Sequence, residues 1–180
     1  MKRALVFGRA QGTWEEVAQA KELCNFDIVI GVGKAGCDYP HPLDHWVSFH
    51  TDLMPHWIET RERNGYPPAG QFWSCNYKGR SARYKSPVPV SLVEVNGGSS
   101  GFVAAIVSLE ALNVDKTILA GIPMTNKAGH YDEQGDWNEA HKYQREWKEK
   151  KDLLIGRVKS MSGWTQELLG APTLEWLNEE

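Results

Sequence analysis

Residues 96–124 constrain the fold of this chain more than any other segment. A glycine-rich turn, Asn96-Gly-Gly-Ser-Ser-Gly101, precedes the apolar run 102–112, which has the length of a buried helix. Residues 116–124 follow and have the composition of a buried strand. A helix followed by a buried strand indicates a parallel α/β sheet, because parallel strands are covered on both faces.

Further apolar runs predict the other strands and helices. The predicted strands are residues 4–7, 26–33, 45–50, 71–75, 91–95 and 157–161. The predicted helices are residues 14–23, 54–64, 137–154 and 173–177. Thr13 is predicted to cap the first helix, with Glu16 completing a capping box, and 34–44 is predicted as a long loop. The sequence therefore predicts a three-layer, Rossmann-like α/β domain with a mainly parallel sheet.

Length and composition favour one domain over residues 1–180. A chain of 180 residues buries a single good core, and no repeat, low-complexity segment or linker divides it. The 3 cysteines lack metal-ligand spacing and fit a reduced, cytoplasmic setting. The apolar run near the N-terminus is too short to predict a signal peptide or a membrane span. The oligomeric state is left open.

The charge of the chain does not point to nucleic acid as a partner. The formal net charge is −3, so no broad attraction to phosphate backbones is expected. Lys78, Arg80, Arg83 and Lys85 form a local basic run within residues 76–91, which are predicted as an exposed excursion. No nucleic-acid-binding signature accompanies that run, so a solvated loop is expected there.

The glycine-rich turn is a candidate anion site. The first N–H groups of a helix have no intrahelical partner, and glycines allow a phosphate or sugar to approach the main chain closely. Ser99 and Ser100 lie outside a Gly-x-Ser-x-Gly elbow, so caps are expected rather than a nucleophile. The turn therefore predicts contacts to a ligand rather than covalent chemistry.

Polar residues gather in the loops that should follow the parallel strands. Loops at 8–13, 31–44, 50–55, 121–131 and 161–165 are predicted to emerge at one edge of the sheet, where ligands of open α/β sheets bind. They contain Arg9, Gln11, Lys34, Asp38, Tyr39, His50, Thr51, Asp52, Thr125, Asn126, His130, Tyr131 and Ser162. His130 follows the predicted strand 116–124, where an imidazole could transfer a proton, and a surface histidine without a role is an equal alternative. This convergence predicts a polar small-molecule site.

Three common kinds of site do not fit the sequence. Gly8-x-x-x-Gly12 lacks the spacing and the acidic residue of a dinucleotide fingerprint, and residues 97–101 lack the Lys-Ser/Thr ending of a P-loop. No metal site is predicted either, because the neighbouring histidines and aspartates match no zinc motif. Those residues are His41, His45, His50 and His56 with Asp38, Asp44 and Asp52. An aromatic set at helical spacing, Trp137, Tyr143 and Trp147, is predicted to pack in the core.

A family resemblance rests on several segments. They are Leu5-Val-Phe-Gly8, Phe26-Asp-Ile-Val, Ser100-Gly101 before a small-residue helix, Val114-Asp-Lys-Thr-Ile-Leu-Ala-Gly-Ile122, and Val158-Lys-Ser-Met-Ser162 with Leu168-Leu169. The order of these elements resembles the bacterial lipooligosaccharide sialyltransferases and the related Rossmann-like group that includes archaeal 6-hydroxymethylpterin pyrophosphokinases. In the sialyltransferases the matching Ser-Gly turn and the later glycine hold a CMP-sugar, and a histidine is the general base.

The resemblance implies roles for particular residues of this chain. Gly8, Ser100, Gly101 and Gly121 would hold the nucleotide, and His130 would be the base. The chain departs from the family where Pro123 replaces a carboxylate that helps to organise the site. The first two loops also lack the family's asparagines, and His50 stands where an asparagine is expected.

These observations lead to a prediction of function with two alternatives. A small glycosyltransferase-type enzyme is expected, with a nucleotide-sugar donor as substrate and with Mg²⁺ left open as a cofactor. The residues expected to contact the donor are Gly8, Arg9, Gln11, His50, Ser99, Ser100, Gly101 and Gly121. One alternative is a pyrophosphokinase-type transferase with Mg²⁺ on carboxylates such as Asp38 or Asp52. The other is a non-catalytic module that binds a nucleotide or phosphosugar, which Pro123 favours.

Overall fold

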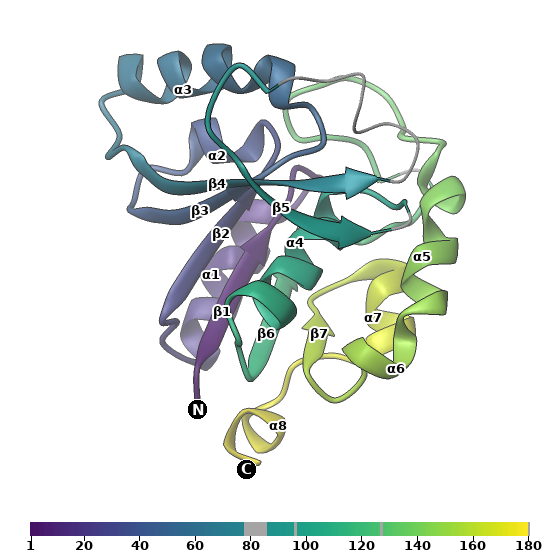
Figure 1. Cartoon of the computed structure of the whole chain (residues 1–180). Coiled ribbons are helices and arrows are strands. Elements are labelled where there is room, and N and C mark those ends of the chain that lie inside the picture. Colours follow the sequence, from purple (N-terminus) through teal and green to yellow (C-terminus); the bar gives the residue numbers. More distant parts are fainter. Residues whose placement is uncertain (78–85, 96, 127, 180) are drawn as a thin grey trace.

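The computed structural model describes residues 1–77, 86–95, 97–126 and 128–179. Within these residues, one sheet contains seven strands, all parallel to their neighbours. In spatial order the strands are β5 (Ser91–Val95), β4 (Ala69–Tyr77), β3 (Leu43–Val47), β2 (Ile28–Val32), β1 (Arg3–Phe7), β6 (Lys116–Ala120) and β7 (Val158–Ser160). Figure 1 shows this sheet twisting through the middle of the molecule. The expected α/β fold with a parallel sheet is confirmed.

The strand order reverses between β1 and β6. The chain builds the sheet outward from β1 to β5, returns through a helix, and adds β6 on the other side of β1. Phe7, at the end of β1, pairs with Gly31 of β2 and with Ala120 of β6. The carboxyl ends of these three strands therefore lie at the same level, and their loops begin at one edge of the sheet. Such a reversal is where open α/β sheets bind ligands.

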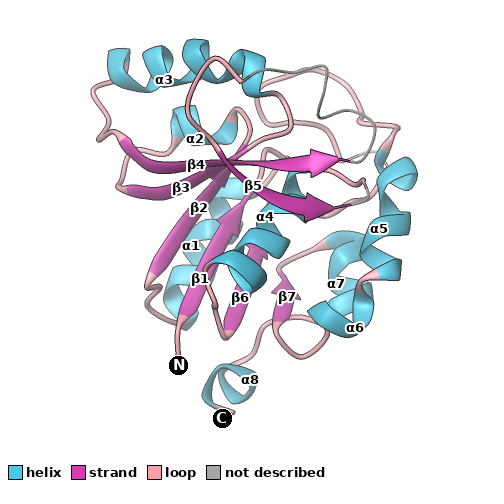
Figure 2. Ribbon diagram, viewed as in Figure 1, coloured by secondary structure: helices cyan, strands magenta, loops and turns pink. Residues whose placement is uncertain are grey.

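Helices cover both faces of the sheet (Figure 2). One apolar cluster packs under α1 (Thr13–Leu23), α2 (Ala35–Asp38), α3 (Met54–Arg63) and α8 (Leu174–Asn178). The other packs under α4 (Ser100–Ile106), its π-helical continuation η2 (Val107–Ala111), α5 (Gln144–Glu149), α6 (Lys151–Leu154) and α7 (Gly163–Leu169). Along β1, Leu5 and Phe7 enter the first cluster, whereas Ala4 and Val6 enter the second. The domain therefore has three layers, with the apolar strands buried on both sides.

The start of α1 differs from the predicted capping box. Gly12 is the residue before the helix, with φ of 82°, a left-handed conformation that glycine adopts without a steric penalty. The Thr13 hydroxyl donates to the Ala10 carbonyl at 2.6 Å, and a Glu16 carboxylate oxygen accepts from the Gly121 N–H at 2.7 Å. The prediction of a capping box was wrong, because the Thr13 and Glu16 side chains bond to the loops after β1 and β6 instead of capping α1.

The predicted helix 137–154 was also wrong in extent. The structure has a 3₁₀ turn, η3 (Ala140–Tyr143), then α5 and α6, which are separated by Lys150 at φ of −101° and ψ of 13°. Trp147 of α5 and Leu154 of α6 are fully buried, so each short helix turns its own apolar residue into the core. The predicted loop 34–44 contains α2, and α7 was not predicted. No helix among the described residues is long and apolar enough to cross a membrane.

Candidate functional site

A cavity of about 890 Å³ lies at the carboxyl edge of the sheet. Residues at or after the ends of six strands line it, from β1 to β6. They are Gly8 to Ala10, Val32 to Lys34, Ser48 to Leu53, Ser74 to Asn76, Gly97 to Gly101, and Gly121 to Met124. The strand-order reversal therefore lies within the cavity wall, as expected for loops that leave one edge of a parallel sheet.

The cavity is lined by His130 and by the residues expected to contact the donor, except Gln11. Six other loop residues predicted to converge on this site are not among the lining residues: Asp38, Tyr39, Thr125, Asn126, Tyr131 and Ser162. The lining includes Gly8, Arg9, His50, Ser99, Ser100, Gly101, Gly121 and His130. Gln11 is not among the lining residues, and its N–H donates to the Gly129 carbonyl at 2.9 Å. Gln11 therefore fixes the turn before His130 instead of facing the cavity.

Packing between two loops explains the glycines at positions 8 and 121. The Gly8 N–H donates to the Ala120 carbonyl at 2.8 Å, which extends the pairing of β1 with β6. A Cβ on Gly8 would lie 2.7 Å from the Ile122 side chain and would overlap the Gly121 carbonyl. Gly121 has φ of +63°, and a Cβ there would overlap the Thr13 hydroxyl. Gly8 and Gly121 both line the cavity, but glycine is required at these positions because the loops after β1 and β6 pack closely there.

The two serines of the glycine-rich turn have different partners. Ser99 caps α4, since its hydroxyl accepts from the Phe102 N–H at 3.3 Å, which confirms that part of the prediction. The Ser100 hydroxyl accepts instead from the Phe49 N–H at 3.1 Å, so it ties the turn to the loop after β3. Asn96, the first residue of the motif, lies outside the described residues.

A buried carboxylate lies beside this turn, which the sequence did not reveal. A Cβ on Gly97 would lie 2.7 Å from Glu146 Oε1, and the Glu146 side chain is 8% exposed. Arg145 donates to the same oxygen at 3.0 Å. Because Glu146 lines the cavity, a phosphate at the turn would meet a like charge. This wall suits the hydroxyl or amino groups of a ligand better than its phosphates.

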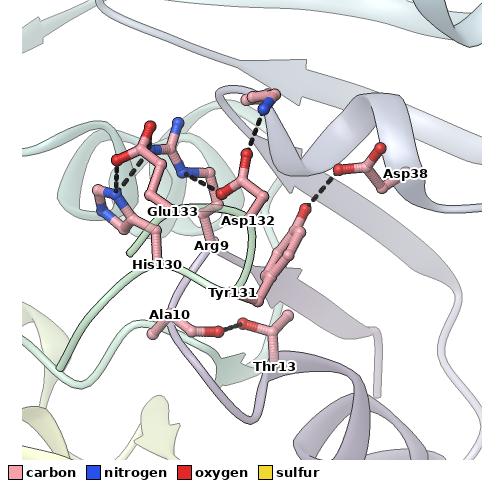
Figure 3. A network of polar contacts seen from close by, with 9 residues as sticks. Arg9, Ala10, Thr13, Asp38, His130, Tyr131, Asp132 and Glu133 are labelled. Carbon is pink, nitrogen blue, oxygen red and sulfur yellow. Dashed lines mark hydrogen bonds and ion pairs between the residues drawn. The ribbon is translucent and has the colours of Figure 1, made fainter. Parts of the chain in front are cut away.

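His130 belongs to a turn that is fastened across the loop after β1. Ala10 and His130 form an antiparallel bridge, and the Tyr131 N–H donates to the Arg9 carbonyl at 3.1 Å. Figure 3 shows the Arg9 guanidinium with His130 and Glu133 on one side and Asp132 on the other. Its Nε lies 3.1 Å from Asp132 Oδ1, and its Nη2 lies 2.5 Å from Glu133 Oε1.

Loops from the second strand complete this polar network. Lys34, which follows β2, pairs with the other oxygen of Asp132, and the Tyr131 hydroxyl donates to Asp38 at 2.8 Å. Burial by itself would raise the pKa of Asp132, but the hydrogen bond from Lys34 and the charges of Arg9 and Lys34 outweigh it and lower that pKa. Burial and the Asp38 carboxylate raise the pKa of Tyr131, so its hydroxyl stays a donor.

Aromatic rings form part of the cavity wall. The Trp137 ring lies 5.8 Å from the Tyr143 ring at an angle of 17°, and 6.0 Å from the His130 ring at 33°. Both Trp137 and Tyr143 line the cavity. Trp147 instead packs on Phe102 and is fully buried. The predicted packing role holds for Trp147, and Trp137 and Tyr143 are partly buried against the same core cluster. The sequence did not reveal that Trp137 and Tyr143 also line the cavity, because the assumed continuous helix gave no reason to separate them from Trp147.

Histidine and carboxylate side chains do not gather into a metal site in the part of the chain that the structure describes. The Trp73 indole N–H donates to His45 Nδ1 at 3.1 Å, and burial lowers the pKa of His45. His50 and Asp52 line the cavity, whereas Asp38 accepts from Tyr131. The basic residues Lys78, Arg80, Arg83 and Lys85 lie outside the described residues.

Comparisons of the chain with protein-family models, with curated proteins and with solved structures found no match. The resemblance to lipooligosaccharide sialyltransferases and pyrophosphokinases therefore stays a prediction from the sequence. The function has to be inferred from the cavity at the carboxyl edge and from the side chains that line it.

Proposed function

We propose that this protein binds a nucleotide-activated sugar in the carboxyl-edge cavity and transfers the sugar, as a small glycosyltransferase-type enzyme. One observation carries the proposal: a single cavity at the reversal of strand order collects Gly8, Gly121, the 97–101 turn and His130. Its volume of about 890 Å³ lies within the range of roughly 300–1,000 Å³ typical of small-molecule sites.

The charges on the cavity wall suggest how such a donor would lie. Arg9 and Lys34 line the cavity near the ends of β1 and β2, and a phosphate of the donor bound there would share their N–H donors with Asp132 and Glu133. Glu146, beside Gly97, would accept hydrogen bonds from sugar hydroxyls or from the amino group of a base. His130 lies on the Arg9 side, next to the expected phosphate.

A non-catalytic binding module is the second candidate. Pro123 lines the cavity immediately after the Gly121-Ile122 turn, at the position where the resemblance calls for a carboxylate. Proline offers no side-chain acceptor or base, so a ligand could be held there without being turned over. The Mg²⁺-dependent pyrophosphokinase alternative remains an untested prediction. Of the two carboxylates named for Mg²⁺, Asp52 lines the cavity, whereas Asp38 accepts a hydrogen bond from Tyr131 and is not among the lining residues.

Two exposed histidines provide a matched test of the site. His50 lines the cavity, whereas His56 lies on α3 outside the lining. Binding of CMP, UDP, GDP, ADP and their sugar conjugates, with and without Mg²⁺, would be followed by thermal shift and calorimetry. His50→Glu is expected to weaken binding by roughly tenfold, because the new carboxylate repels the phosphates, and His56→Glu should change it less than about twofold.

The outcomes separate the candidates. Stabilisation by no nucleotide or conjugate would refute the proposal, and equal effects of the two variants would place the ligand elsewhere. Binding followed by release of free nucleotide in the presence of sugar acceptors would support a transferase, and binding without turnover would support the module. Substitution at Gly101 is a poor probe, because a Cβ there would lie 2.8 Å from the Ile122 side chain and disturb the core.

A further inference from the structure

Arg9 makes an unusually close contact with the ring of His130. Its Nη2 lies 2.6 Å from His130 Nδ1 and 2.5 Å from Glu133 Oε1 (Figure 3). The other carboxylate oxygen of Glu133 lies 3.1 Å from the same Nδ1. Three groups therefore meet around one ring nitrogen, and their donor and acceptor capacities determine where the ring proton lies.

The two neighbours of Nδ1 make opposite demands on it, because Arg9 can only donate and the Glu133 carboxylate can only accept, and the closer contact decides between them. Arginine has only N–H donors, and its Nη2 carries two hydrogens, enough for one bond to Nδ1 and one to Glu133. The Glu133 carboxylate pairs with the Arg9 guanidinium, and as a carboxylate it can only accept. If Nδ1 carried a proton, that proton would point at the hydrogens of Nη2 only 2.6 Å away. An unprotonated Nδ1 faces Glu133 Oε2 only at the longer distance of 3.1 Å, so the contact with Arg9 favours Nδ1 as an acceptor.

The remaining ring nitrogen then carries the proton. A neutral imidazole with an accepting Nδ1 has its hydrogen on Nε2, and a protonated ring would again place an N–H against the guanidinium. The His130 ring lines the cavity and lies against Trp137, with the ring centres 6.0 Å apart. Because Nδ1 is occupied by Arg9 and Glu133, the ring nitrogen left for a ligand is thus an N–H donor rather than a lone pair.

Other side chains hold Arg9 in place for this contact. Asp132 faces the guanidinium Nε at 3.1 Å and also pairs with Lys34. The Tyr131 N–H donates to the Arg9 carbonyl at 3.1 Å, which fixes the backbone of Arg9 next to the His130 turn. The charged groups that face Arg9 and His130 are therefore Asp132, Glu133 and, through Asp132, Lys34.

We propose that Arg9 is a positioning residue that holds His130 in its Nε2–H form, so that His130 donates a hydrogen bond to a phosphate oxygen of the bound nucleotide. This inference rests on the proposed nucleotide site. It assigns to His130 a role opposite to the general base that the resemblance implies, because an Nε2 that already carries a proton cannot take one from an acceptor hydroxyl. A donor at this position stabilises the negative charge that collects on a departing nucleotide phosphate.

The tautomer of His130 is measurable without any ligand. The full chain would be labelled with ¹⁵N-histidine and observed by long-range ¹H–¹⁵N NMR at pH 8, with His130→Gln to assign the ring. The wild-type ring is expected in the Nε2–H form. Arg9→Met removes the donor and should convert the ring to the Nδ1–H form, which donates to Glu133. Lys34→Met removes a nearby charge that does not touch the ring and should leave the tautomer unchanged.

A second variant keeps the test decisive if Arg9→Met does not fold. Glu133→Gln leaves the Arg9 contact intact, so the Nε2–H form should persist. An Nδ1–H ring in the wild type would overturn the inference, and so would an Nε2–H ring that survives Arg9→Met.

The ligand half of the inference is tested in the complex. With a bound nucleoside monophosphate, the Nε2 proton should remain and shift downfield, and conversion to the Nδ1–H form would refute the donor role. An Nε2–H ring in a protein that binds no nucleotide would refute the proposed function and keep the role of Arg9 in setting the tautomer. If the protein binds nucleotide and the His130 ring is in the Nδ1–H form, the proposed function stands and the role of Arg9 in setting the tautomer is refuted.

Discussion

Arg61 is a buried cation whose hydrogen-bond partners are backbone carbonyls. Its side chain is 1% exposed and donates to the carbonyls of Gly36, Tyr39, His41 and Pro67 at 2.6–2.8 Å. Gly36 and Tyr39 lie at the end of α2, where helix carbonyls lack intrahelical partners. Burial lowers the pKa of Arg61, and the converging carbonyl dipoles are what keep the charge acceptable inside the protein.

Replacement of Arg61 by methionine should be strongly destabilising. Arg61→Met keeps the apolar stem and leaves several buried carbonyls unpaired, so the free energy of unfolding is expected to fall by about 3–5 kcal/mol. Urea denaturation would measure the change. Arg63→Met on the exposed end of the same helix is the control and should change it by less than about 0.5 kcal/mol. Similar losses in both variants would contradict the role given to the Arg61 carbonyl contacts.

A comparison of Gly121 with Gly65 distinguishes the effect of a left-handed backbone from the effect of a crowded side chain. Both have positive φ, at +63° and +74°, but a Cβ would overlap the Thr13 hydroxyl at Gly121 and would have no atom within 4 Å at Gly65. Gly65→Ala is expected to lower the free energy of unfolding by about 1–2 kcal/mol through the left-handed backbone alone. Gly121→Ala should lose about 1–3 kcal/mol more through overpacking. Thermal denaturation would measure both variants. Equal losses of unfolding free energy would show that the Thr13 side chain moves away from the new methyl group without a measurable loss of stability.

At the scale of elements, ion pairs and hydrogen bonds connect the 128–133 turn to other loops. It bridges Ala10, and its side chains reach Arg9 after β1, Lys34 after β2 and Asp38 in α2. Glu133 is 56% exposed, and its pairing with Arg9 is therefore expected to contribute little by itself. The position of His130 in the cavity wall thus depends on a network of charges from three separate loops.

Acid should release this turn before it unfolds the domain. The folded-state pKa of Asp132 lies below its unfolded value, so its contribution to stability is present above the unfolded pKa and is lost as the pH falls through the folded pKa. Glu133 has the same sign of shift. The protection factor of the Tyr131 amide, whose N–H donates to Arg9, is expected to fall below about pH 4, while the protection factors of the β1 amides stay high.

Asp132→Asn is the control for the acid effect. The amide cannot ionise, so the Tyr131 amide should exchange faster already at neutral pH and show a weaker dependence on acid. If the wild type and this variant respond to acid in the same way, the Asp132 ion pairs do not hold the turn.

At the scale of the whole molecule, stability should be highest in the strands around the reversal of strand order. Among the described strands, β1 is paired on both sides, by β2 and β6, and β5 is paired only with β4. Residues Ala4 to Phe7 have no exposed surface, whereas Leu92 of β5 is 57% exposed. Backbone hydrogen bonds in the centre of a sheet open only with the global transition, while edge strands open locally.

Hydrogen exchange tests this distribution directly. Amides of β1 and β6 are expected to exchange only through global unfolding, with a steep dependence on urea, and amides of β5 should exchange faster with a shallow dependence. Mass spectrometry of peptides across both strands would measure the two rates. Equal protection and equal urea dependence would mean that the sheet opens as one unit.

The sequence by itself determined the α/β class, the parallel sheet and most of the strands. Apolar runs of strand length and the glycine-rich turn before an apolar helix carry this information locally, because burial on both faces requires an apolar run. The same local rules predicted at which edge of the sheet the cavity lies, because the carboxyl ends of parallel strands meet at one edge. They failed for Thr13 and for the helix 137–154, where tertiary contacts outweighed capping and periodicity.

Only the tertiary structure decided which side chains meet inside the cavity. Arg9 and His130 are 121 positions apart, and Glu146 lies against Gly97 from a different segment of the chain. No local pattern encodes such pairs, because they depend on the strand order that sets the loop after β1 beside the loop after β6. The sequence thus nominated His130 as a functional residue, and the contact with Arg9 assigned the nitrogen that carries its proton.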